Sequence, residues 1–181
     1  MTRRKVLLTS ALGVIAAMVA SLAGQRSARA VSPEQEQAEL ASSLSGVKVS
    51  LQQGLKASEP EGQPISGKFE VEDGKLQLSV YTAKEGKFFE VIVDHMTGNI
   101  AKVEPITEGE DLIHAKLQKA AMDGAKVKLS DAAEKAKGQV KGPDGDVIVV
   151  SVVPLLKGKS PEASIVLLTG KRFSTASERL D

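Results

Sequence analysis

Alternation of apolar and polar positions predicts strands in the first half of the chain. Apolar side chains alternate with polar ones from 76 to 81, and the same period of two recurs at 69–71 and 87–94. The turn sequence Asp73-Gly74 and the segment 84–86 separate these runs at hairpin spacing. Residues 69–94 are therefore expected to form three consecutive antiparallel strands.

A second set of three strands is expected between 147 and 177. Residues 147–153 are apolar almost throughout, a turn follows at 157–159, and the segments 163–169 and 172–177 complete the set. A continuously apolar strand is typical of burial on both faces. Alternating strands, in contrast, indicate a sheet that helices cover on one side.

Two helices are expected before each set of strands. The first helix of each pair ends at a glycine, Gly46 or Gly124, in the left-handed conformation that terminates many helices. Shorter second helices are expected at 51–58 and 130–140, the latter with Ser130 as its N-cap.

The helix before Gly124 opens with Thr107-x-x-Glu110, the pattern of a capping box. Helical spacing groups its apolar side chains on one side, which we expect to be buried. These side chains are Leu112, Ile113, Leu117, Ala120 and Ala121.

Short sequences recur in the same order in both halves of the chain. The segment 46–51 (GVKVSL) returns at 124–129 (GAKVKL) with four identities in six positions, and 86–89 (GKFF) returns at 170–173 (GKRF). Two matches in register favour an internal duplication. We therefore expect two units, at 31–106 and 107–181.

The N-terminal segment 1–30 has the pattern of a signal peptide. Arg3, Arg4 and Lys5 precede an apolar stretch at 6–24, and Ala28-Arg29-Ala30 provides the small-residue pattern that precedes cleavage. The mature chain would then start at Val31, with an uncleaved membrane anchor as the alternative. The arginine pair is typical of twin-arginine export, while ordinary secretion is the other interpretation. Either route predicts a periplasmic or secreted protein.

Charge and composition narrow the classes of partner. The chain has 24 basic and 23 acidic residues, and cleavage would remove five basic and no acidic ones, leaving a net charge of −4. A nucleic-acid partner is not expected, nor is membrane association after cleavage, because both need a basic surface. The absence of cysteine excludes disulfides and thiol chemistry.

The repeated segments and one turn together resemble the PepSY domain. Val93-Asp94-His95-Met96-Thr97-Gly98-Asn99-Ile100 matches the family pattern V-D-x-x-T-G-x-I, and Tyr81 and the turn Asp73-Gly74-Lys75 stand where the family has a strand tyrosine and its preceding turn. The second unit departs from this pattern. The segment 165–168 replaces the tyrosine strand, and 178–181 stands where D-x-x-T-G would be.

The resemblance implies an α+β fold of two tandem, cystatin-like units, each with helix packed on antiparallel sheet. It also implies an exported, non-catalytic module that binds peptides or proteins and restrains or regulates a peptidase of the cell envelope. The implied partner is a peptide or an exported peptidase, and no cofactor is expected. Fold resemblance constrains function only weakly.

Six residues are candidates for a binding site in the first unit. They are Tyr81, Phe88, Phe89, Asp94, His95 and Gly98. The segment 94–98 has a structural interpretation as well, because aspartate bonds its own downstream backbone and glycine accepts positive φ in a tight turn. A recognition patch built from some of these side chains is the other interpretation.

Catalysis is not expected from this sequence. His95 falls in a predicted turn, no G-x-S-x-G elbow is present, and Gly158-Lys159-Ser160 lacks the glycine that a phosphate-binding loop needs at Val153. An alternative function is an envelope sensor or accessory subunit that reads a metal ion or small ligand through the acidic helix start at 108–114. Glu110, Asp111 and His114 offer ligands there, although acidic residues also favour a helix start through its dipole.

Overall fold

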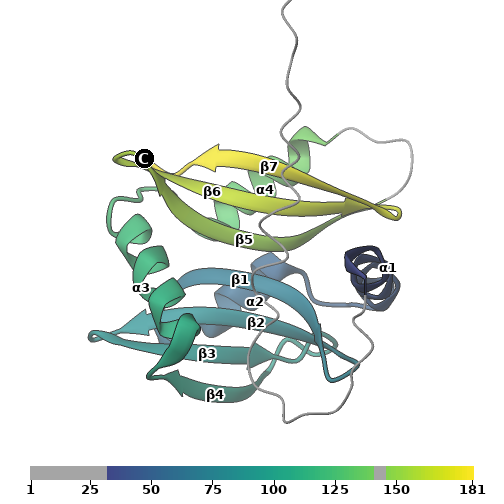
Figure 1. The fold of residues 1–181 in the computed structure, drawn as a ribbon, viewed down its shortest axis with the longest axis horizontal. Helices are drawn as coiled ribbons and strands as arrows, with labels where there is room; N and C mark the ends of the chain where they lie inside the picture. Colours follow the sequence, from purple (N-terminus) through teal and green to yellow (C-terminus); the bar gives the residue numbers. More distant parts are fainter. Residues whose placement is uncertain (1–31, 141–145) are drawn as a thin grey trace, which may run out of the picture.

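The computed structural model describes residues 32–140 and 146–181, and in this part of the chain seven antiparallel strands form one continuous sheet (Figure 1). The strand order is β4-β3-β2-β1-β5-β6-β7. The predicted α+β class with antiparallel strands is therefore confirmed. The signal peptide expected at 1–30 and its cleavage before Val31 lie outside the described residues.

The first four strands form a meander in one half of the sheet. Their bounds are β1 Gln63–Glu72, β2 Lys75–Lys84, β3 Lys87–Val93 and β4 Ile100–Ile106. The two hairpin turns have positive φ at Asp73 and Gly74 (49° and 72°) and at Glu85 and Gly86 (52° and 76°). Turns of this kind match the twist of antiparallel strands. The first three strands were predicted, and β4 was not.

The last three strands form the other half of the sheet. Their bounds are β5 Val147–Lys157, β6 Ser160–Thr169 and β7 Arg172–Arg179. The halves join where β1 runs antiparallel to β5, through the pairs Gly67↔Val152 and Lys68↔Ser151. The two central strands of the sheet are thus the first strand of each half.

Four α-helices and a short 3₁₀ helix accompany the strands in the described residues. They are α1 Pro33–Leu44, α2 Leu51–Ser58, the 3₁₀ helix η2 Glu59–Glu61, α3 Gly109–Asp123 and α4 Leu129–Gln139. Ser32 and Ser50 each form a capping box with the glutamine three residues on, which fixes the starts of α1 and α2.

Helices cover both faces of the sheet, which corrects the expectation of one-sided cover. α2 packs so closely on one face that a Cβ at Gly67 would lie 3.1 Å from Leu55 Cδ2, and α4 packs beside α2. α3 lies on the opposite face, where the Ser66 hydroxyl donates to Gln118 Oε1 (2.8 Å). In Figure 1, α3 passes in front of the strands, while α2 and α4 lie behind them.

The predicted details of α3 are wrong in three respects. Its N-cap is Glu108 with no side-chain bond, so Thr107 and Glu110 form no capping box. Gly124 ends the helix at φ −92°, which is not the left-handed conformation. The buried side consists of Ala115, Gln118, Ala121 and Met122, whereas Ile113 and Leu117 are 59% and 64% exposed and Ala120 is also exposed. The helix is rotated so that Gln118 reaches Ser66.

Burial of β5 is complete on only one face. Val149 and Val152 are 3% and 0% exposed beneath α4 and α2, whereas Ile148 and Val153, which point to the other face, are half-buried. The predicted burial of both faces is therefore confirmed for the face beneath α4 and α2, whereas the other face is only half-buried. α4 begins at Leu129 after Lys128, so Ser130 lies inside the helix rather than at its cap.

Candidate functional site

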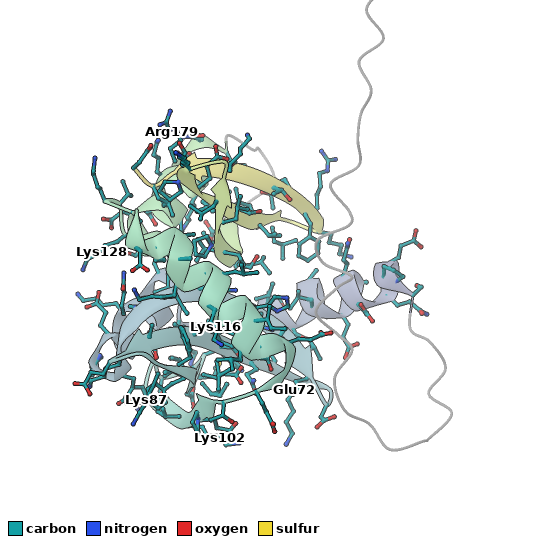
Figure 2. The ribbon with its side chains drawn as sticks, turned by 60° about the vertical axis from the view of Figure 1, so that its left-hand side comes forward. Glu72, Lys87, Lys102, Lys116, Lys128 and Arg179 are labelled. Carbon is teal, nitrogen blue, oxygen red and sulfur yellow. The ribbon has the colours of Figure 1, made fainter. Side chains whose placement is uncertain are left out.

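The sheet has two outer strands, β4 and β7, and in the described residues each pairs with a neighbour on one side only. An unpaired strand edge presents free N–H and C=O groups that can bond to another extended chain. Figure 2 shows the two edges at opposite ends of the molecule, with Lys102 on β4 at the bottom and Arg179 on β7 at the top. The two edge strands differ in how accessible their unpaired N–H and C=O groups are.

The β4 edge has features that oppose further pairing. Pro105 has no N–H, and the register with β3 shifts between Ile92 and Val93. Lys102 and Glu104 form an exposed ion pair (2.8 Å) in the same strand. Proline, irregular register and charge are devices by which natural sheets protect an edge.

The β7 edge has none of the proline or irregularity found in β4. β7 pairs with β6 in one unbroken register from Thr169↔Arg172 to Glu162↔Arg179. Its central residues at 174–177 are small, with the sequence Ser-Thr-Ala-Ser. This strand is therefore regular and sterically open along its outer side.

Interactions near its C-terminal end hold β7 in place. The Glu178 carboxylate is 6% exposed, where it accepts from Lys135 Nζ (2.6 Å) and Gln139 Nε2 (2.7 Å) of α4. The Leu180 N–H donates to the Pro161 carbonyl (2.9 Å) and the Leu180 side chain is fully buried. A strand anchored in this way offers a preorganised edge, so a binding segment need not order it.

Tyr81 is buried beneath α3 and is not available as an outward recognition side chain. It is 8% exposed, and its hydroxyl donates to Asp111 Oδ1 (2.8 Å). Burial and the bond to Asp111 hold the pKa of the Tyr81 hydroxyl far above its usual range. The hydroxyl therefore serves to fix α3 on the sheet.

Phe88 and Phe89 lie on opposite faces of β3, because successive side chains in a strand alternate. Both are half-buried; Phe88 stands opposite Ile106 of β4, and Phe89 stands opposite Pro105. Asp94 follows the far end of the strand, about 20 Å from Phe88 at the usual rise per residue. The structure therefore does not bring the six predicted residues together into one patch.

The segment from Asp94 to Gly98 is a tight turn held by backbone bonds. Asp94 Oδ1 accepts from the N–H groups of Met96 (2.8 Å) and Thr97 (2.9 Å), and these bonds lower the pKa of its exposed carboxyl. Gly98 has φ +79° and donates its N–H to the Asp94 carbonyl (2.8 Å). These contacts agree with the structural interpretation of the motif.

His95 contributes to the fold through its backbone. Its carbonyl accepts from the N–H groups of Lys48 and Val49 (both 3.1 Å), in the first copy of the repeated segment. At the end of β7 the Leu180 carbonyl likewise accepts from Lys126 and Val127 in the second copy. The repeated K-V sequence thus makes the same contact in both halves.

A polar cluster that the sequence analysis did not identify lies beside α3 on β1, β2 and β3. Ser79 is 1% exposed and donates to Glu70 Oε1 (3.0 Å), while Glu70 Oε2 pairs with Lys68 Nζ (2.6 Å). Burial raises the pKa of the neighbouring Glu90 carboxyl. The alternation of polar residues from Lys68 to Glu70 and from Gln77 to Ser79 was its signal.

A small pocket of about 290 Å³ lies between α2, the start of β1 and the start of α4. Leu55, Met122 and Leu129 line it, and Lys128 and Glu59 form an ion pair (3.1 Å) at this site. Ser130 also lines the pocket, and its hydroxyl donates to Asp131 Oδ1 (3.2 Å).

The alternative metal site at the start of α3 is not assembled. Across residues 32–140 and 146–181, no three His, Cys, Asp or Glu side chains lie close enough to share a metal ion. Asp111 instead accepts the bond from Tyr81, and Glu108 occupies the N-cap position. None of the helices in the described part of the chain combines the length and apolar character needed to span a membrane.

Comparison with known proteins provides no assignment. No family model, curated protein or solved structure matches the chain.

Proposed function

We propose that this chain is an exported module of two tandem PepSY-like units that binds an extended peptide or protein segment without turnover. Its partner is an exported peptidase, which it restrains in the cell envelope. The observation that carries this proposal is the open, regular edge of β7, since strand edges bind extended chains through backbone hydrogen bonds.

The strands of the two halves share one offset in residue number, which supports the tandem organisation. β2 at 75–84 corresponds to β6 at 160–169, and β3, which begins at 87, corresponds to β7, which begins at 172. The register with the neighbouring strand shifts at Ile65 in β1 and at Val150 in β5, which are related by the same offset. The central pair Gly67↔Val152 also has this offset, as expected for two copies related by a local two-fold axis.

This correspondence leaves one place in the sheet without a counterpart. β4 pairs with the outer side of β3, but no strand of the described residues occupies the equivalent place beside β7. A partner segment added there would repeat a pairing that the first unit already contains. The pairing of β4 with β3 within this chain is therefore the precedent for the proposed binding at β7.

The proposal is tested by titrating a thermolysin-like peptidase from the cell envelope of the same organism with purified protein comprising residues 31–181. The initial rate on a fluorogenic peptide is expected to fall to a plateau at a fixed molar ratio. Mass spectrometry of the recovered chain is the control, since a merely competing substrate would be cut. An unchanged rate with no complex on size-exclusion chromatography would count against the proposal, as would hydrolysis of the peptide by the purified protein alone.

A further inference from the structure

We infer that the outer edge of β7 binds its partner segment antiparallel, in the register that β4 adopts beside β3, and with an apolar side chain opposite Phe173. This inference rests on the proposed function and specifies where the partner segment lies. It also defines the chemistry of the segment.

The register follows from the constant offset that relates β3 to β7. In the strand register Phe88 corresponds to Phe173, one residue away from the equivalence of Phe89 and Phe173 that the GKFF and GKRF sequences suggest. Val91 likewise corresponds to Ala176. Beside β3, Ile106 stands opposite Phe88 and Val103 stands opposite Val91. A segment in the same register places one apolar residue opposite Phe173 and another, three residues earlier in its own sequence, opposite Ala176.

Phe173 is the principal side chain for such a contact. It is half-buried, it lies at the start of β7, and its inner neighbour across the sheet is Leu168 of β6. Aromatic side chains paired with branched apolar ones across antiparallel strands stabilise the pairing relative to Ala–Ala pairs. The outer side of Phe173 has no equivalent of Ile106 among the described strands.

Charge at the same end of β7 favours an acidic residue in the segment. Lys171 and Arg172 are both exposed, and no carboxylate of the described residues lies within 4.0 Å of either. The segment runs antiparallel, so its residues after the apolar one reach these cations. The expected sequence is therefore apolar-x-x-apolar followed within two residues by Asp or Glu.

A second copy of this chain fits the edge less well. In an antiparallel β7–β7 pair with a two-fold axis at Thr175, Phe173 would stand opposite Ser177 and Lys171 opposite Arg179. With the axis at Ala176, Phe173 would face Arg179 instead. With the axis at Phe173 the two phenylalanines would face each other, but only residues 172–174 of the two β7 strands would pair. The longer registers give Phe173 no apolar partner, and like charges directly opposite one another are unfavourable.

The probe for the test is a synthetic peptide with this chain's own sequence at 100–108, in which Pro105→Val restores the missing N–H. Amide shifts in ¹⁵N NMR are expected to concentrate on 171–179, and Phe173→Ala is expected to weaken the apparent affinity about two- to fivefold. Phe88→Ala is the matched control, because the equivalent phenylalanine already lies beside β4. A peptide with Ile106→Asp should bind at least fivefold more weakly.

A backbone test distinguishes edge pairing from side-chain contact. Neighbouring strand residues point their amides in opposite directions, so of Thr175→Pro and Ala176→Pro one removes a bond to β6 and the other an outward donor. The outward variant is expected to keep its melting temperature and to lose at least tenfold in peptide affinity. Phe173→Ala keeps the inference testable if neither proline variant folds.

Several outcomes would overturn the inference. They are shifts centred on β4 or α3, no saturable binding, unchanged affinity in Phe173→Ala, and a dimer that Phe173→Ala dissociates. The peptidase inhibition experiment tests the proposed function separately from the β7 site. Inhibition that survives the outward proline variant removes β7 as the site but leaves the proposed function, whereas peptide binding at β7 without inhibition removes the peptidase role alone.

Discussion

Gly98 is the residue of the Asp94 turn that no other side chain can replace without strain. Its φ is +79°, and a Cβ there would meet Val49 only at ordinary contact distance, 3.6 Å. We expect Gly98→Val to lower the unfolding free energy by about 1–2 kcal/mol, because the left-handed region penalises a β-branched residue. Urea denaturation followed by circular dichroism measures this loss.

Gly46 provides the matched control for this substitution. It lies outside the left-handed region and has open space around the position of a Cβ. Gly46→Val should therefore cost less than Gly98→Val. Equal losses in the two variants would show that the conformation of Gly98 contributes nothing, and the Asp94 turn would then need another explanation.

Glu90 is expected to make stability depend on pH. Burial raises the pKa of its carboxyl above the ordinary 4.5, so the folded state binds a proton more tightly than the unfolded state. Stability attributable to this residue is therefore highest below about pH 4.5 and falls as pH rises through the folded pKa. Glu90→Gln should raise the melting temperature at pH 7.5 by more than it does at pH 4. An equal change at both pH values would contradict this assignment.

At the residue scale, the sequence predicted the Asp94 turn but not the surroundings of Tyr81. The turn depends on local bonds among residues 94–99, which the sequence carries in full. The bond from Tyr81 to Asp111 joins residues 30 positions apart and depends on how α3 crosses the sheet. No local pattern encodes that crossing, so Tyr81 could not be distinguished from an outward recognition residue.

The two faces of β5 should respond differently to the same substitution. Val149 is 3% exposed on the face that α4 and α2 cover, whereas Ile148 is half-buried on the other. Val149→Lys is expected to lower the unfolding free energy by about 3 kcal/mol or more, since an unpaired ammonium would be buried. Ile148→Lys should cost less, because its long chain can carry the charge to water. Urea denaturation of both variants tests this, and equal losses would contradict the one-sided burial.

At the element scale, periodicity found the strands that have one buried face and missed the one that has none. β4 is exposed along nearly its whole length and contains Pro105, so it shows neither apolar alternation nor a favourable strand composition. For α3, the apolar residues Ile113 and Leu117 led to a wrong prediction of the buried side, because both side chains are exposed. The buried side includes Gln118, which the bond from Ser66 makes acceptable in the interior.

At the scale of the whole molecule, the sequence predicted the α+β class with antiparallel strands, but not the way in which the two halves of the sheet meet. The contact between β1 and β5 is confined to two residue pairs around Gly67 and Val152. It depends on packing of α2 and α4 side by side on one face and of α3 on the other. Such long-range pairing leaves no periodic signal within either half.

The joined sheet has a functional consequence, because it places the β4 and β7 edges at opposite ends. With β1 and β5 paired at the centre, neither central strand has a free edge for a partner along that pairing. Pro105 and the shifted register protect the β4 edge. Of the two outer edges, we therefore expect that of β7 to receive a binding segment.

Hydrogen–deuterium exchange of the complex with an active-site-blocked, thermolysin-like peptidase tests this central claim most directly. The account predicts that peptides covering 172–179 exchange at least tenfold more slowly in the complex, while those covering 100–106 keep their rate. Slower exchange confined to β4 or α3, or unchanged exchange at β7 in a complex that forms, would contradict it.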